Sequence, residues 1–136
     1  MSYHVGRLID HVHLKVKDLP ASRRFYDAVL DALGLPPAQD YGELIEADEL
    51  CLSHGEPVTS GLHLAFQAAD RDAVHRFHAA ALTAGGRDNG APGERHYHPG
   101  YYGAFVLDPD GNNIEAVCHG PIERSAPSVV ITRVKS

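Results

Sequence analysis

The sequence predicts an α+β fold in which two tandem β-α-β-β-β modules form one curved mixed sheet with helices on its outside. The first observation behind this prediction is a repeat: residues 11–34 align without a gap on residues 63–86. Nine of these 24 positions are identical, against about one or two expected from ordinary amino-acid usage. The identical pairs include His11/His63, Asp18/Asp70, Phe25/Phe77 and Gly34/Gly86. The second observation is that each copy passes from a strand-like to a helix-like hydrophobic pattern.

Each module is expected to open with a strand, over residues 8–16 in the first and 62–68 in the second. Side chains alternate between the two faces of a strand. In residues 8–16, Val12 and Leu14 fall on one face, whereas His11 and His13 fall on the other. In residues 62–68, apolar side chains likewise alternate with His63. Both strands therefore present one apolar face to be covered and one face that carries histidine.

A helix is expected to follow each strand, over residues 19–33 and 71–84. Apolar residues recur at helical spacing in both segments, as at Phe25 and Val29. Asp18 and Asp70 stand where N-terminal caps belong, and Gly34 and Gly86 stand where glycine commonly ends a helix. Both copies therefore carry the same start and stop signals at equivalent positions.

The remaining residues of each module have the pattern of short strands. We expect them at 39–47 and 49–54 in the first module, and at 101–107 and 112–119 around the turn Asp108–Asn112 in the second. Residues 87–100 are rich in glycine and proline and are expected to form a loop with room for one short strand. The chain is therefore a single domain, 1–136, with repeats at about 8–55 and 61–119. In the tail 121–136, Val129–Ile131 suggest either a final strand or a docked segment.

Composition excludes several classes of partner. The net charge is −6 and the basic residues form no cluster, which disfavours nucleic acid as a partner. No run approaches the roughly 20 apolar residues of a membrane span, and the first residues lack the pattern of a signal peptide. Cys51 and Cys118 are far apart and form no paired motif, as expected of a cytoplasmic protein with reduced thiols.

Three residues form a candidate metal site. His11 and His63 occupy equivalent positions of the two repeats, and a pseudo-twofold relation would bring them together across a cavity. Glu115 follows the Asp108–Asn112 turn on the last predicted strand. Two imidazoles and one carboxylate suit a single divalent ion such as Fe, Mn, Ni, Co or Zn, with coordination positions left open. The repeat register pairs His13 with Ala65, so His13 is expected beside the substrate rather than on the metal.

The segments 10–26, 61–66 and 105–115 resemble signatures of the glyoxalase/bleomycin resistance/extradiol dioxygenase superfamily, also called the vicinal oxygen chelate superfamily. This resemblance implies that His11, His63 and Glu115 bind the metal. It also implies a small oxygen-rich substrate, chelated through two neighbouring oxygens, and a homodimer. The expected reaction is that of a lyase, isomerase or dioxygenase. The alternative is a drug-binding or resistance protein of the same fold without catalysis.

The resemblance leaves the reaction open. Isomerases of this superfamily usually carry a second glutamate ligand, for which Glu49 is a candidate. Ring-cleaving members usually carry a tyrosine where this chain has Phe105, which argues against ring cleavage. His98 and Tyr102 lie in a polar segment before the last hairpin and are the candidates for acid–base catalysis, with His13 as a third catalytic candidate.

Overall fold

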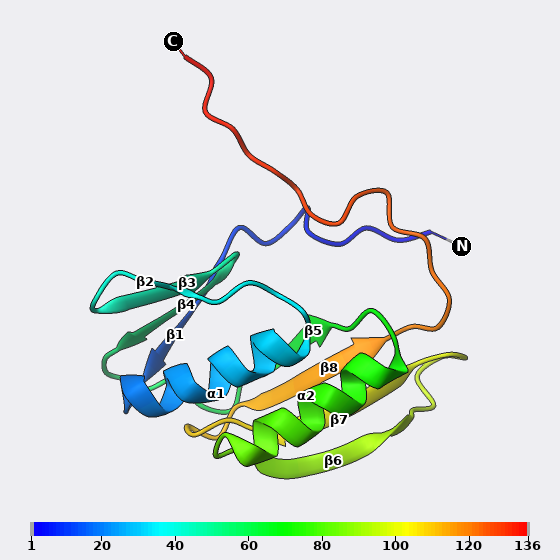
Figure 1. Ribbon diagram of the computed structural model, residues 1–136, viewed down its shortest axis with the longest axis horizontal. Coiled ribbons are helices and arrows are strands. Elements are labelled where there is room, and N and C mark those ends of the chain that lie inside the picture. The colour runs from blue at the N-terminus through cyan, green and yellow to red at the C-terminus, as the bar shows by residue number, and fades with distance from the viewer. Residues whose placement is uncertain (1, 136) are drawn as a thin grey trace.

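The computed structural model describes residues 2–135 and contains two modules of the same element order (Figure 1). The first comprises β1 (Val12–Val16), α1 (Leu19–Ala32), β2 (Gln39–Asp40), β3 (Leu44–Ala47) and β4 (Leu50–His54). The second comprises β5 (His63–Gln67), α2 (Arg71–Thr83), β6 (Arg87–Glu94), β7 (Tyr102–Leu107) and β8 (Asn113–Cys118). The predicted α+β class with two tandem β-α-β-β-β modules is confirmed.

The strands are divided between two four-stranded sheets rather than joined in one. Their orders are β1-β4-β3-β2 and β5-β8-β7-β6, so each module repeats the same topology. In both sheets the first strand pairs in parallel with the last, and the other pairs are antiparallel. The first strand of each module therefore lies at an edge of its sheet, beside the strand that closes the module.

Both helices begin as the sequence predicts. The Asp18 carboxylate accepts a hydrogen bond from the backbone N–H of Ala21, and the Asp70 carboxylate accepts the equivalent bond from Ala73. These bonds satisfy N–H groups that have no partner within the helix. Gly34 follows α1 with a positive φ of 78°, as expected of a terminating glycine.

The second helix ends differently from the prediction, because Gly85 rather than Gly86 adopts the positive φ, at 99°. Gly86 is instead required for close packing. A Cβ atom there would lie 2.5 Å from Val106 and 2.7 Å from the Phe25 ring. The repeated glycine thus serves a different purpose in each module.

The two modules share one hydrophobic core. Helices α1 and α2 lie side by side across it (Figure 1), and Phe25 and Phe77, equivalent in the repeat, are both fully buried. The Arg76 side chain of α2 also donates to the backbone carbonyl of Ala32 at the end of α1. Because apolar side chains of both sheets enter this common core, neither module buries its apolar face independently.

The strand expected over 8–16 begins only at Val12, and the strand expected over 39–47 is divided into β2 and β3. Two later segments also differ from the sequence prediction. Residues 87–94, expected mainly as a loop, form β6, whose pairing with β7 is irregular near Gly90. Glycine and proline weaken the strand signal there, and the partner strand supplies the missing stabilisation. No strand or helix is assigned beyond β8 in the described chain, and the tail runs away from both sheets (Figure 1).

A buried polar network holds the hairpin between β7 and β8. The Asp108 carboxylate, almost fully buried, accepts hydrogen bonds from the Tyr26 hydroxyl at 2.6 Å and from the backbone and side-chain amide of Asn112, each at 2.9 Å. Burial and the neighbouring Asp108 charge raise the pKa of Tyr26, which keeps it a hydrogen-bond donor. Asn112 also accepts from the N–H of Leu62, just before β5. One network therefore joins α1, the β7–β8 turn and the start of β5.

Among the described residues, no helix combines the length and the apolar character needed to cross a membrane.

We expect Tyr26→Phe to lower the free energy of unfolding by about 1–3 kcal/mol, because it removes a hydrogen bond to a buried carboxylate while leaving the ring in place. Urea unfolding at fixed protein concentration measures this change. Tyr41→Phe is the matched control: Tyr41 is exposed and should change stability by less than about 0.5 kcal/mol. Equal effects of the two substitutions would contradict the stabilising role of the Asp108 network.

Candidate metal centre

Glu115 is the centre of a compact polar cluster on the second module. It lies on β8 with only 1% of its side chain exposed. One carboxylate oxygen is 2.8 Å from Nε2 of His63, and the other accepts a hydrogen bond from the hydroxyl of Tyr101. A buried carboxylate is costly unless charged or hydrogen-bonding groups surround it. His63 and Tyr101 supply those groups here.

The strands around Glu115 leave room for these contacts. Phe105 of β7 lies directly opposite Glu115, and its ring centre is 5.9 Å from that of His63. Gly103, two residues earlier on the same face, has no side chain, and a Cβ atom there would come within 3.0 Å of the Glu115 carboxylate. Glycine at this position therefore allows Tyr101 to reach the carboxylate.

A histidine pair borders Tyr101. Nε2 of His98 is 2.9 Å from Nδ1 of His119, so one ring donates and the other accepts. Both rings lie edge-on to Tyr101, each with a centre-to-centre distance of 5.3 Å. Partial burial and the nearby His98 lower the pKa of His119, which favours its neutral form. Burial, together with the Glu115 carboxylate, raises the pKa of Tyr101, which keeps its hydroxyl protonated.

The histidines of the first module have other partners. His11 precedes β1, is 62% exposed, and contacts the Asp10 carboxylate through Nδ1 at 2.6 Å. His13, on β1, hydrogen-bonds through Nε2 to the hydroxyl of Ser53 at 2.6 Å. Neither contacts Glu115 or His63 in this chain.

The structure thus brings together two of the three predicted metal ligands, His63 and Glu115, and leaves His11 apart. Within residues 2–135 no three or more His, Cys, Asp or Glu side chains are grouped so as to hold a metal ion. His63 is 55% exposed, so its outer side is open to a further group.

Strand register shows that Cys51, and not Glu49, occupies the position in the first module that Glu115 occupies in the second. In the second module Glu115 pairs with Ala65, two residues after His63. In the first module the residue two after His11 pairs with Cys51. Glu49 precedes β4 in an exposed turn. Cys51 thus takes the position equivalent to Glu115, and burial raises the pKa of its thiol.

Tyr102, proposed from the sequence as a catalytic residue, points away from this cluster. Its hydroxyl is 2.7 Å from Nε2 of His75 on α2, and the guanidinium of Arg71 lies 4.5 Å above its ring. Neighbouring residues of a strand face opposite sides, so Tyr101 meets Glu115 while Tyr102 meets the helix. Of the three catalytic candidates, only His98 lies beside the Glu115 cluster.

Two members of the cluster, Tyr101 and His119, were not identified from the sequence. Strand alternation carries the signal for both: Tyr101, Gly103 and Phe105 share one face of their hairpin, and His119 lies four residues after Glu115. The contact between Tyr101 and Glu115 depends on how β7 pairs with β8, which the pattern of one segment does not give.

Comparison with known proteins agrees with this architecture. The profile of the glyoxalase/bleomycin resistance protein/dioxygenase superfamily matches residues 8–116. A glyoxalase/bleomycin resistance protein from Albidiferax ferrireducens T118 is similar with 33% identity and a TM-score of 0.72, covering 81% of this chain and 98% of that one. Oxidase ChaP-H1 is similar with 26% identity and a TM-score of 0.58, covering 80% and 93% of the two chains.

A glyoxalase-related enzyme from Fulvimarina pelagi shares the fold at 22% identity with a TM-score of 0.62, covering 88% of this chain and 99% of that one. No curated protein matches the chain. The profile match spans both modules and includes His11, His63 and Glu115. The chain therefore belongs to the glyoxalase/bleomycin resistance protein/dioxygenase superfamily.

Proposed function

We propose that the protein is a metal-dependent enzyme in which His11, His63 and Glu115 hold one divalent ion. The observation that carries this proposal is the buried Glu115 carboxylate, paired with the partly exposed imidazole of His63. A carboxylate oxygen and an imidazole nitrogen at one place suit Fe, Mn, Co, Ni or Zn. Members of this superfamily commonly bind metal ions, and the donor set present here fits that chemistry.

The exposure of the two histidines suggests how His11 reaches the site formed by His63 and Glu115. His63 and His11 are each more than half exposed, on separate sheets of one chain. A homodimer in which His11 of one copy faces His63 and Glu115 of the other would complete the site. Twofold symmetry would then produce two identical sites per dimer.

When bound, the ion would act as a Lewis acid that chelates two neighbouring oxygens of a small substrate and stabilises negative charge on them. The residues of the chain complement this role. Tyr101 holds one oxygen of Glu115 and so orients the carboxylate. The His98–His119 pair lies beside Tyr101, and neutral His119 can accept a proton near neutral pH. These groups support proton transfer, as lyases and isomerases require.

The rival function is binding of a small molecule without catalysis. The direct contact between His63 and Glu115 supports it, because the imidazole gives the buried carboxylate a polar partner without a metal. Metal content separates the two functions. A purified protein without metal, whose thermal stability does not rise on adding Mn, Fe, Co, Ni or Zn, would favour the binding protein.

Substitution of each histidine tests the ligand assignment. We expect His11→Ala, His63→Ala and Glu115→Gln to lose most of the bound metal, which elemental analysis measures. His13→Ala is the matched control: it should keep the metal, with affinity lowered at most about 10–100-fold, as for residues that only support ligands. Metal retained in His11→Ala but lost in His13→Ala would reverse the assignment of the two neighbours.

Mixing two deficient variants tests whether two chains share the site. If they do, re-associating equal amounts of His11→Ala and His63→Ala should restore about one quarter of the wild-type metal, because half of the dimers are mixed and each contains one intact site. The variants measured separately are the control. No recovery in mixed dimers, identified by a size tag, would place the whole site within one chain.

The two adjacent tyrosines provide a further test. Tyr101→Phe should lower metal affinity about 10–100-fold, because Glu115 loses the group that orients it. Tyr102→Phe, on the opposite face of the strand, should leave the affinity unchanged. Isothermal titration with Mn or Co measures both. An equal loss in the two variants would show that the Tyr101 contact does not support the metal site.

A further inference from the structure

The tail beyond β8 exposes an apolar segment that the proposed function does not use. Val129, Val130, Ile131 and Val134 are 74%, 81%, 86% and 92% exposed. A run of β-branched residues is typical of a strand that packs on a partner, and exposing so many together is unfavourable. From Ser125 to Lys135 the charged side chains are Arg133 and Lys135, both basic.

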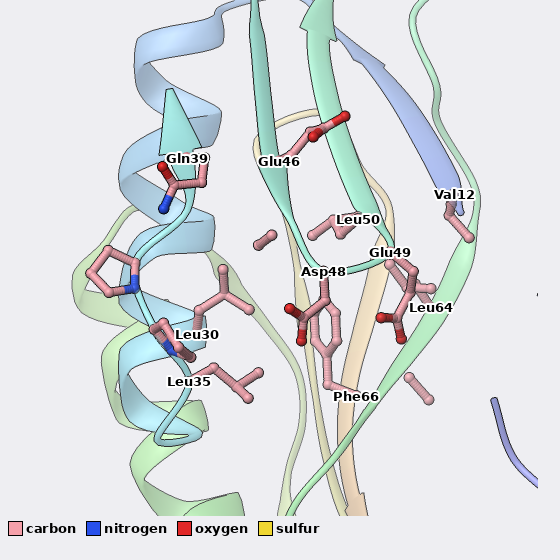
Figure 2. A pocket seen from close by; sticks show the side chains of 14 residues that line it. Val12, Leu30, Leu35, Gln39, Glu46, Asp48, Glu49, Leu50, Leu64 and Phe66 are labelled. Carbon is pink, nitrogen blue, oxygen red and sulfur yellow. The ribbon is translucent and has the colours of Figure 1, made fainter. Parts of the chain in front are cut away.

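A groove elsewhere on the chain has complementary properties. It lies between α1 with the loop that follows it and strand β5, and its volume is about 230 Å³. Figure 2 shows Leu30 and Leu35 on one side, Leu64 on the other and Phe66 between them. This volume is below the roughly 300–1,000 Å³ of typical small-molecule sites, which favours a few apolar side chains as the occupant.

The acidic side chains of the groove and the edge backbone of β5 are both complementary to the tail. Glu46, Asp48 and Glu49 line the groove, and none of them forms an ion pair within residues 2–135. Figure 2 shows the carboxylates of Asp48 and Glu49 beside the apolar side chains. In addition, consecutive residues of β5, 64–66, line the groove, and β5 is an edge strand whose backbone can pair with an added strand.

We propose that the tail segment 128–135 of a second copy of this chain docks in this groove along the edge of β5. Val129 and Ile131 cover the apolar walls, and Arg133 and Lys135, on the same face of an extended segment, meet the acidic side chains. The tail leads away from the sheets of its own chain, which favours a second copy as the acceptor (Figure 1). Neither His63 nor Glu115 is among the residues that line the groove, although Val12, beside His11, and Leu64, beside His63, are.

Disulfide trapping between separately substituted full-length chains tests the proposal. Val129→Cys is mixed with Leu35→Cys under mild oxidation, and a size tag on one chain identifies the mixed product on a non-reducing gel. A disulfide forms only when the two Cα atoms approach within about 7 Å. The native Cys51 and Cys118 are buried and give the background of the wild-type protein.

Leu82→Cys is the matched control for the groove, because Leu82 is exposed to a similar degree, 37% against 41% for Leu35, and does not line the groove. We expect at least about tenfold more mixed product with Leu35→Cys than with Leu82→Cys, since docking raises the effective concentration of the thiols. Adding Ile131→Glu to the tail chain should remove this excess.

Charge reversal extends the same assay. Glu49→Lys in the groove chain should reduce the product, and Arg133→Glu in the tail chain should restore it. Equal products with Leu35→Cys and Leu82→Cys would overturn the proposed docking. A disulfide that forms within one chain carrying both Val129→Cys and Leu35→Cys, with none between separate chains, would overturn the assignment to a second copy. Metal content plays no part in this readout, so failure here and failure of the metal site are distinguishable.

Discussion

The buried Asp108 carboxylate is the constraint on which the rest of the second module depends. A carboxylate removed from water must be compensated by hydrogen bonds, and Asp108 receives them from Tyr26, from two groups of Asn112 and from the N–H of Asp110. Three of these donors form the β7–β8 turn, and Tyr26 belongs to the first module. Because Asn112 also binds the N–H of Leu62, the network sets where both β5 and β8 begin. His63 is the first residue of β5 and Glu115 is the third residue of β8, so the network also fixes where both candidate ligands of the second module lie.

The two modules share one core but carry different potential ligands. Helices α1 and α2 pack together, and the histidine-bearing faces of β1 and β5 remain open. The second module carries a complete pair, His63 with Glu115. The first has His11, but Cys51 occupies the position of the carboxylate. The duplication therefore repeated the scaffold and one histidine, whereas the carboxylate is present once, which suits a three-ligand site.

Structural relatives of this chain include an oxidase and proteins named for glyoxalase and bleomycin resistance, so the fold alone does not select a reaction. The groups near Glu115 narrow the range of reactions that we propose for the site. In the proposed enzyme, the tyrosine hydroxyl on the carboxylate would position it, and the hydrogen-bonded histidine pair beside it would transfer protons. Phe105 lies opposite Glu115, yet the nearby Tyr101 still brings a phenol to the site.

The sequence by itself determined the duplication, the helices and their Asp18 and Asp70 caps, because these depend on local hydrogen bonds and on spacing within one segment. It also identified the three candidate ligands through the repeat and the turn before Glu115. Only the tertiary structure decided that β6 forms in a glycine-rich segment, because its stability comes from pairing with β7. It likewise decided that Tyr101 rather than Tyr102 meets Glu115, and that His11 lies apart, because both depend on how separate strands and modules pack.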